Sequence, residues 1–324
     1  MSIKKWWLAI AGFTIGVVII LGSFNPLSAQ NSPQIYVFGD SLSDIGNVYK
    51  ATNGNSPPSP PYFKGRYSNG PVWVEYLASK LKLTSNLDNN FAYGGAKTGD
   101  SQQLPPGVLA QIQRFKTKNS AANPKALYVI WAGANDYLGG ATDTTVPINN
   151  LATAVKRLLE MGAKNIIVVN LPDLGKLPAT HTTERAKSLK SLTQSHNSRL
   201  TASLESLRQK FANINIRYID VNALFNQVYT APGKYGFNNV TQPCLREGVV
   251  CDRPNEYLFW DGIHPSTAAH KLLVQLASSQ LKSTPKSATN SSTKLALPLS
   301  ILIFTVLAVS LIMWKRRKRI RNSS

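Results

Sequence analysis

The stretch "QIYVFGDSLSDIGN" (residues 34–47) joins a short run of strand-forming residues to a turn rich in Gly, Ser and Asp. The β-branched and aromatic side chains before the turn predict a buried β-strand. A Gly-Asp-Ser sequence is by itself an ordinary turn, because these residue types commonly form one. A chemical role for Ser41 therefore depends on what the rest of the chain brings to the same place.

The same pattern, a short apolar run followed by a helical stretch, recurs along the middle of the chain. This alternation predicts a parallel sheet with helices on both faces, and no repeat or composition break divides it, so we expect one domain over residues 31–282. The predicted strands are "QIYVF" (34–38), "NNFAY" (89–93), "ALYVIWA" (126–132), "NIIVVNL" (165–171) and "NIRYID" (215–220). The predicted helices lie near residues 71–82, 105–117, 148–161, 181–211 and 266–281.

The carboxyl ends of these strands carry glycine-bearing turns. In open α/β sheets ligands bind outside this edge, so the turns should converge on one site. They are Gly39-Asp40-Ser41, Gly94-Gly95, Gly133-Ala134-Asn135-Asp136 and Pro172-Asp173-Leu174-Gly175. A long loop rich in Pro, Gly and Asn, residues 53–70, follows the first strand and is expected to shape the mouth of that site.

A serine nucleophile needs a base within hydrogen-bond reach and a third group that orients the base. The chain has four histidines, so the search is short. His181 and His196 lie in a long polar helical stretch and are expected to face solvent. His270 lies inside the last predicted helix, where a partly packed position is expected.

His264 differs from the other three because it lies in a turn, "WDGIHPS" (residues 260–266), just before that helix. Pro265 can open the helix at its first position. Asp261, three residues upstream, is close enough to accept a hydrogen bond from one ring nitrogen. That bond would fix the tautomer and leave the other nitrogen free to accept the proton of a serine, unless Asp261 is only a turn former.

Seven blocks of this chain resemble, in order and approximate spacing, those of the GDSL esterase/lipase family within the SGNH hydrolases. The resemblance runs from about residue 35 to residue 277. The blocks are "FGDSLSDIGN", "GRYSNGPVWVEYLA", "NFAYGGAKT", "WAGANDYL", "NLPDLGKLP", "HNSRL" and "FWDGIHPS". It implies a flavodoxin-like three-layer α/β/α sandwich with a central five-stranded parallel sheet.

The resemblance also implies the roles of individual residues. Ser41 would be the nucleophile, His264 the general base and Asp261 the group that orients His264. The backbone N–H groups of Ser41 and Gly95 and the side-chain amide of Asn135 would form the oxyanion hole, which suits a glycine that admits close approach and a neutral amide donor. Gly94 is the alternative to Gly95.

Two small features separate this chain from related patterns. Ser266 stands where the family commonly has threonine, and either residue can serve a helix start. Ser43 stands two residues after Ser41, so the Gly-x-Ser-x-Gly elbow of α/β-hydrolases is absent.

These assignments predict a serine ester hydrolase of the esterase/lipase type, acting through an acyl-enzyme on a small-molecule, lipid or acylated-glycan ester. An acyltransferase would use the same acyl-enzyme, and a non-catalytic envelope-binding module should have lost one of the triad residues. The resemblance implies neither a cofactor nor a metal. A carboxylate metal site is the competing interpretation of four aspartates that are otherwise expected to shape turns: Asp40, Asp44, Asp136 and Asp173.

Both ends of the chain resemble targeting segments. Residues 1–29 have the basic, apolar and small-residue regions of a secretory signal peptide. Residues 295–314 carry no charge and are long enough, at about 1.5 Å per residue, to span a hydrocarbon core of about 30 Å as a transmembrane helix. A polar stalk (283–294) precedes this segment and a basic cytoplasmic tail (315–324) follows it. We therefore expect an exported, membrane-anchored protein with its domain in the periplasm or at the cell surface, an arrangement that suits a bacterium.

The net charge of the predicted domain indicates which kinds of partner it could attract. Ten of the 36 basic residues lie outside residues 31–284 and all 16 acids lie inside, which leaves 26 basic against 16 acidic side chains, a domain charge of +10. Such a surface is attracted to anionic head groups or acidic polymers, or is simply a solvated basic face. Nucleic acid is not an expected partner, because export removes the protein from it. The two cysteines, Cys244 and Cys251, predict one local disulfide rather than free thiols or a zinc site.

Overall fold

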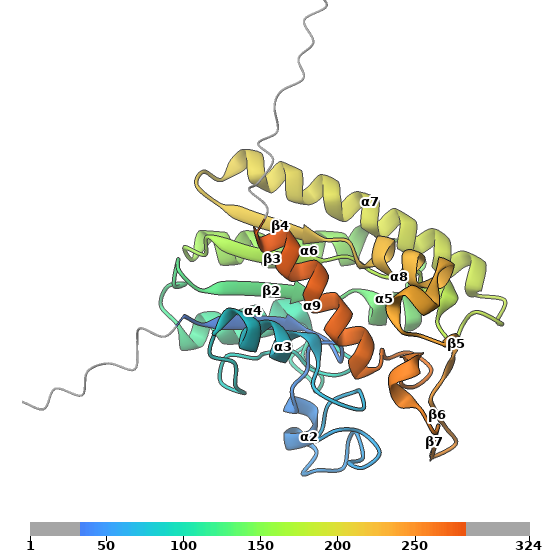
Figure 1. The fold of residues 1–324 in the computed structure, drawn as a ribbon. Helices are drawn as coiled ribbons and strands as arrows, with labels where there is room; N and C mark the ends of the chain where they lie inside the picture. Colours follow the sequence, from blue (N-terminus) through green and yellow to red (C-terminus); the bar gives the residue numbers. More distant parts are fainter. Residues whose placement is uncertain (1–32, 283–324) are drawn as a thin grey trace, which may run out of the picture. The chain divides into compact units, whose positions relative to one another are not determined.

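The computed structural model describes residues 33–282, and a four-stranded parallel sheet lies at the centre of this region (Figure 1). The strands pair in the order β1-β2-β3-β4, so that each lies beside its neighbour in the sequence. Their bounds are Ile35–Gly39 (β1), Leu127–Trp131 (β2), Asn165–Val169 (β3) and Asn215–Ile219 (β4). The predicted α/β fold with a parallel sheet is confirmed, and so are four of the five predicted strands.

The fifth predicted strand, residues 89–93, is wrong as a strand. The segment runs beside β1, since the N–H of Val37 donates to Asn89 O (3.0 Å) and the N–H of Phe91 donates to Val37 O (2.7 Å). It makes only one isolated bridge, between Val37 and Asn90. The ladder is interrupted at Gly39, whose N–H donates to the Gln111 side chain (2.8 Å), and it resumes where the Tyr93 N–H donates to Gly39 O (3.1 Å). A side chain therefore interrupts the pairing that the sequence pattern predicts, and the segment does not form a regular strand.

Helices cover both faces of the sheet and divide the buried residues into two hydrophobic clusters. Alternate residues of the strands point to opposite faces, so Val37 and Val129 join one cluster while Phe38 and Ile130 join the other. The first cluster is covered by α3, α8 and α9, and the second by α4 and α6, whereas α7 contributes to both. In Figure 1, α9 crosses one face of the sheet and α7 runs along its β4 edge.

All five predicted helices are present, with shifted ends, and three helices were not predicted. The predicted ones are α3 (Trp73–Leu81), α4 (Val108–Lys118), α6 (Thr145–Glu160), α7 (Ala186–Lys210) and α9 (Thr267–Lys282). The others are α2 (Asn47–Ala51), α5 (Ala134–Leu138) and α8 (Val221–Thr230). The short helices α2 and α5 directly follow the turns after β1 and β2, and so position the residues of those turns.

Short elements gather between α8 and α9. They are the 3-10 helices η3 (Pro232–Tyr235) and η4 (Pro254–Glu256) and the strands β5 (Asn239–Pro243), β6 (Leu245–Arg246), β7 (Val249–Val250) and β8 (Tyr257–Phe259). Another 3-10 helix, η2 (Leu174–Lys176), lies earlier in the chain, between β3 and α7. β5 pairs with β8, and β6 with β7. A disulfide joins Cys244 to Cys251 across the β6–β7 hairpin, as the sequence predicts.

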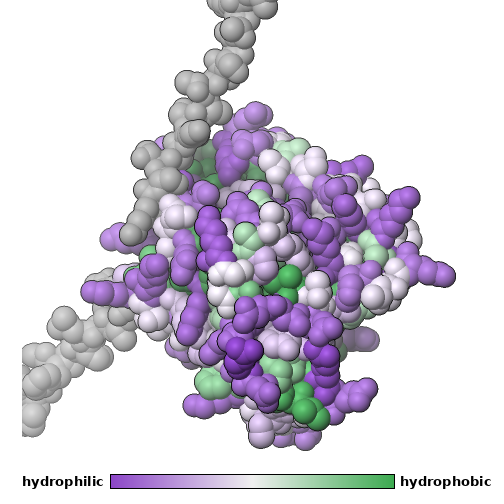
Figure 2. All heavy atoms as spheres, turned by 45° about the vertical axis from the view of Figure 1, so that its right-hand side comes forward, coloured by the Kyte–Doolittle hydropathy of each residue, from purple (hydrophilic) through white to green (hydrophobic). Residues whose placement is uncertain are grey.

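The face seen in Figure 2 is mostly hydrophilic, with hydrophobic side chains in small separate patches. Within residues 33–282, no helix combines the length and the apolar character that a membrane span requires. The predicted signal peptide, stalk, transmembrane helix and tail all lie outside the described residues.

Candidate active site

The turn after β1 is held by the two aspartates that flank Ser41. The carbonyl of Asp40 accepts the N–H groups of Ser43 (3.1 Å) and Asp44 (3.0 Å), and its side chain accepts that of Leu42 (3.1 Å). Asp44 accepts four more backbone N–H groups, those of Gly46, Asn47, Val48 and Gly94. These bonds fix the backbone on both sides of Ser41, which lies at the carboxyl end of the strand.

The turn before α9 brings His264 to this strand end. Its Nε2 atom lies 2.9 Å from Ser41 Oγ, and its Nδ1 atom lies 2.7 Å from Asp261 Oδ2. The three side chains therefore form a continuous hydrogen-bonded series although Ser41 and His264 are 223 positions apart. A proton on Nδ1 lets the ring donate to Asp261 and leaves Nε2 to accept from the serine hydroxyl.

Every described contact of the Asp261 carboxylate is with a hydrogen-bond donor. Oδ1 accepts the N–H groups of Ile263 (2.8 Å) and His264 (2.7 Å). Oδ2 accepts the hydroxyl of Tyr62 (2.7 Å) beside the His264 ring. Burial alone would raise the pKa of Asp261, but the charge of His264 and the hydrogen bonds from His264 and Tyr62 lower it to about 2. The carboxylate is therefore ionised at neutral pH.

The turn after segment 89–93 contains Gly94 and Gly95, and the two glycines differ in whether their backbone N–H is hydrogen-bonded. The N–H of Gly94 donates to Asp44 (2.9 Å), and a Cβ on Gly94 would meet the Tyr67 ring at 2.2 Å. Gly95 has φ +80°, a left-handed conformation that favours glycine, and is exposed. Within residues 33–282, no acceptor lies within hydrogen-bond reach of the Gly95 N–H. Of the two, only Gly95 has a backbone donor free for a substrate.

The third turn places Asn135 in the first turn of α5. Its side-chain amide donates to Ala96 O (3.0 Å), next to Gly95 in the chain. The same nitrogen lies 3.5 Å from Asp40 Oδ2, at the limit of a hydrogen bond. One amide hydrogen is thus fixed by Ala96, and the other is only weakly engaged. Asn135 and Ser41 both line the narrow pocket described below.

The aspartates proposed as a competing metal site do not form a cluster. Asp136 accepts the backbone and side chain of Thr98 (3.0 and 2.8 Å), and Asp173 accepts the N–H of Gly175 (3.0 Å). Across residues 33–282 there is no group of three or more His, Cys, Asp or Glu side chains arranged to hold a metal ion. Asp40 is unusual in another way, since burial raises its pKa to about 7.

Comparison with known proteins assigns the family. The family model described as GDSL-like lipase/acylhydrolase matches residues 35–277. The chain belongs to this family. The resemblance that the sequence predicts is therefore confirmed, and the protein is an enzyme that hydrolyses ester bonds. The range matched spans the sheet, the strand-end turns and most of α9.

Two relatives and one solved structure illustrate the similarity. Phosphatidylcholine-sterol acyltransferase of Aeromonas hydrophila is 25% identical, and the alignment covers 86% of this chain and 98% of the relative. The thermolabile hemolysin of Vibrio parahaemolyticus is 29% identical, over 75% of this chain and 62% of the relative, so the chain spans less than two thirds of the hemolysin. An aryl esterase structure from M. smegmatis has a TM-score of 0.47 and 15% identity, covering 77% of this chain and 98% of that chain.

In this GDSL-family enzyme a narrow apolar pocket opens beside Ser41. Its volume is about 30 Å³, so only a small group fits without movement of the walls. Most of its lining is aliphatic or aromatic, and the polar groups lie at the Ser41 end. The lining residues are Asp40, Ser41, Leu42, Trp131, Ala134, Asn135, Leu138, Pro172, Leu174, Leu177, Phe225, Phe259, Ile263 and Pro265. The pocket suits the acyl part of an ester better than a charged group.

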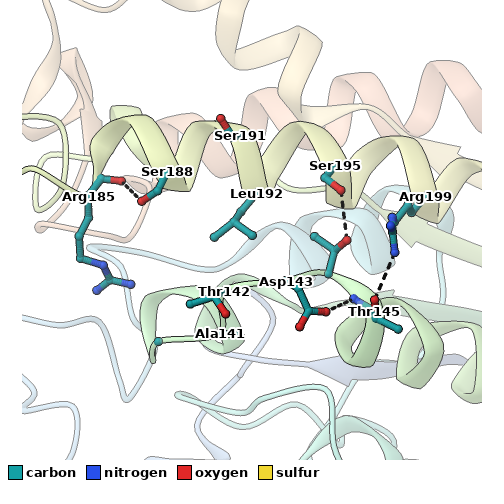
Figure 3. Close-up of a pocket in the computed structure, with 12 residues that line it drawn as sticks. Ala141, Thr142, Asp143, Thr145, Arg185, Ser188, Ser191, Leu192, Ser195 and Arg199 are labelled. Atoms are coloured by element: carbon teal, nitrogen blue, oxygen red, sulfur yellow. Dashed lines mark hydrogen bonds between the residues drawn. The ribbon is translucent and has the colours of Figure 1, made fainter.

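A larger cavity of about 700 Å³ lies elsewhere, between α7 and residues 140–145 (Figure 3). Arg185 and Arg199 line opposite ends of it, and Ser188, Leu192 and Ser195 point into it from α7. No predicted site residue lines this cavity. Residues of the candidate site therefore line only the smaller of these two pockets.

The other histidines differ from expectation in two of three cases. His181 is exposed, as predicted. His196 is fully buried rather than solvated, with Nδ1 2.8 Å from the Tyr137 hydroxyl, and burial lowers its pKa to about 3. His270 is also fully buried, accepts the Trp73 N–H (3.2 Å), and burial followed by the charge of His264 lowers its pKa to about 3. His264 is the only one of the four hydrogen-bonded to Ser41.

Sequence reasoning missed one contact in the site. Tyr62 was expected only to shape the mouth of the pocket, yet its hydroxyl bonds to Asp261, 199 positions away. No local pattern could have indicated this pairing, because both residues lie in irregular loops whose paths the sequence does not specify.

Proposed function

We propose that the protein is a serine esterase in which Ser41 is the nucleophile, His264 the general base and Asp261 the group that orients it. The observation that supports this is the hydrogen-bonded series from Ser41 Oγ through both ring nitrogens of His264 to Asp261 Oδ2. Such a series activates a serine for attack on an acyl carbonyl. Its place outside a strand end of the parallel sheet also suits a ligand site.

In the proposed reaction Ser41 Oγ attacks the ester carbonyl carbon while its proton passes to His264 Nε2. The tetrahedral intermediate then collapses, and His264 gives that proton to the departing alcohol, leaving an acyl-serine. Water enters, loses a proton to His264 and attacks the acyl carbon. The second intermediate releases the carboxylic acid as Ser41 takes its proton back.

The oxyanion of each intermediate would be bound by the N–H groups of Ser41 and Gly95 and by the Asn135 amide. Within the described residues the two N–H groups have no protein acceptor, which leaves them free for an oxygen. The bond from Asn135 to Ala96 O holds the amide next to Gly95, so it need not reorganise during the reaction.

The Ser41→Ala variant tests this proposal. The expected loss of kcat is on the order of 10⁶, because the variant cannot form the acyl-enzyme. Ser191→Ala is the matched control, since Ser191 is an exposed serine of α7 and its hydroxyl bonds only to its own helix. Hydrolysis of an aryl ester by the full-length chain is the measurement. Wild-type activity in Ser41→Ala would refute Ser41 as the nucleophile, whereas a wild-type protein inactive on every ester tested would favour the non-catalytic binding module.

A second candidate is acyl transfer to an acceptor other than water. It is favoured by the Aeromonas hydrophila relative, which is named as an acyltransferase and is matched over 98% of its length. The two reactions share the acyl-enzyme and differ only in what attacks it. Incubation of a labelled ester with a lipid alcohol, followed by product analysis, separates them: a new ester indicates transfer, and free acid alone indicates hydrolysis.

We further propose that the domain is exported and membrane-anchored, on the strength of the sequence patterns of residues 1–29 and 295–314. Its ester substrate would then be a small molecule, a lipid or an acylated glycan outside the cytoplasm. Protease treatment of spheroplasts, which have lost any outer barrier, should digest the domain if it lies outside the inner membrane. Recovery of undigested domain in the cytoplasmic fraction would contradict this location.

A further inference from the structure

The loop of residues 53–70 reaches the triad through Tyr62. The tyrosine hydroxyl donates to Asp261 Oδ2 at 2.7 Å, the same oxygen that lies 2.7 Å from His264 Nδ1. Asp261 Oδ1 is already occupied by two backbone N–H groups of its own turn. Tyr62 is therefore the only described side chain besides His264 that hydrogen-bonds to this carboxylate.

Two contacts anchor the loop to neighbouring elements and so restrict where Tyr62 can lie. Ser68 donates to the carbonyl of Pro265, the residue after His264 (2.9 Å). Arg66 forms an ion pair with Glu75 of α3 (2.7 Å), which ties the loop to the helix layer. These contacts hold the loop against both the His264 turn and α3, and they deliver the Tyr62 hydroxyl to the carboxylate.

A second tyrosine of the loop, Tyr67, packs against His264, the residue that hydrogen-bonds to Asp261. The Tyr67 ring lies 5.1 Å from the His264 ring, centroid to centroid. Gly94 leaves room for it, since a Cβ there would clash with the Tyr67 ring. The loop thus contacts the carboxylate through one hydroxyl and the imidazole through one aromatic face.

We propose that Tyr62 is a positioning residue that holds the Asp261 carboxylate in line with His264 and moderates its charge. This inference rests on the proposed function, since it assigns Tyr62 a role through the proposed triad. Tyr62 does not act on the substrate, and its effect passes through Asp261 to the imidazole.

The hydroxyl has two consequences for proton transfer. It restrains the carboxylate, so that Oδ2 stays aimed at Nδ1 when the imidazolium forms. It also withdraws negative charge from Oδ2, because it donates a hydrogen bond to that oxygen. Without the hydroxyl, Oδ2 stabilises the imidazolium more strongly, and a higher pH is needed to free the base form of His264.

Other titratable groups near His264 do not change in a Tyr62 variant. Asp40 interacts with His264 from the β1 end, and His270 does so from α9. Tyr67 packs on the ring from the same loop as Tyr62. A shift in the pH dependence on removal of the Tyr62 hydroxyl therefore reports the contact with Asp261.

Tyr62→Phe in the full-length chain tests the proposal, with kcat and KM measured on a soluble aryl ester from pH 5 to 9. We expect kcat to fall about tenfold with little change in KM, since one hydrogen bond to a charged group is lost outside the substrate contacts. The rising limb of kcat/KM should move to higher pH by about half a unit. Tyr49→Phe is the matched control, because no described residue hydrogen-bonds to its hydroxyl, and it should match the wild type.

A double variant separates positioning from a general structural role. Where Asp261→Asn has already removed the carboxylate, adding Tyr62→Phe should lower kcat less than twofold. An unchanged pH limb, or an equal loss in both backgrounds, overturns the role of Tyr62. Ser41→Ala separates failure of the proposed function from failure of this inference. If Ser41→Ala stays active, the proposed function fails. If Ser41→Ala is inactive while Tyr62→Phe behaves as wild type, only the role of Tyr62 fails.

Discussion

At the scale of single residues, Asn135 offers a direct test of the proposed oxyanion hole. Asn135→Ala removes a neutral donor, so kcat should fall by about 10² to 10³ with a small change in KM, because the lost bond forms mainly in the transition state. Asn226→Ala, an exposed asparagine of α8, is the control. Steady-state kinetics on the same ester give the comparison. A KM effect without a kcat effect would assign Asn135 to ground-state binding instead.

Asp40 supplies a residue-scale prediction about stability. Burial raises its pKa to about 7, whereas an unfolded aspartate titrates near 3.9, so the folded state binds a proton that the unfolded state has released. The free energy of unfolding should therefore fall as pH rises from about 4 to 7. Asp40→Asn lacks this titration, and its stability relative to wild type should rise over that window by up to about 4 kcal/mol.

Urea denaturation at pH 4, 6 and 8 measures this effect, with the exposed Asp88→Asn as control. The informative quantity is the change with pH, because any packing defect of the Asn side chain is the same at each pH. Parallel stability curves for the variant and the wild type would show that Asp40 is ionised in the folded protein throughout this range.

At the scale of elements, α9 connects packing to the site. It begins at Thr267, three residues after His264, and buries Leu273 in the cluster that also contains residues of α3. Leu273→Ala should lower the free energy of unfolding by about 2–5 kcal/mol, since it leaves a cavity in a packed core. Gln275→Ala on the exposed face of the same helix should change it by less than about 0.5 kcal/mol. Thermal unfolding followed by circular dichroism compares them, and equal effects would contradict the packing described.

The sequence predicts elements well where one physical signal dominates. The strands β1 to β3 are largely apolar runs, β4 alternates polar and apolar residues, and the five long helices have apolar periodicity, so these elements are visible in the chain. Segment 89–93 has a strand-like pattern, but a hydrogen bond from Gly39 to the distant Gln111 interrupts its pairing with β1. His196 was predicted to face solvent because the surrounding stretch is polar. Its four-residue spacing from Leu200, and that of Leu200 from Leu204, nevertheless places it on the buried stripe of α7.

At the scale of the whole molecule, the residues of the candidate site were predictable because topology gathers strand ends at one edge of a sheet. Ser41, Asn135 and His264 lie far apart in the chain, yet each follows a recognisable strand or precedes a recognisable helix. Tyr62 was not predictable as a partner of Asp261, since the path of a long loop depends on anchors such as Ser68 to Pro265. Recognition of a motif therefore extends to short turns that flank regular elements and stops at contacts made by long loops.

Residues 31–282 are expected to form an active domain without the two chain ends. Both hydrophobic clusters, the disulfide and the described contacts of the candidate site lie within residues 33–282. A segment of residues 31–282 should therefore fold and hydrolyse a soluble aryl ester with a kcat/KM within about twofold of the full chain. On esters presented in anionic vesicles, the full chain should be the more active if residues 295–314 hold it at the bilayer, because tethering raises the effective concentration of substrate. Equal activity of both forms on vesicles would contradict anchoring, whereas loss of activity on the soluble ester would show that the ends contribute to the fold.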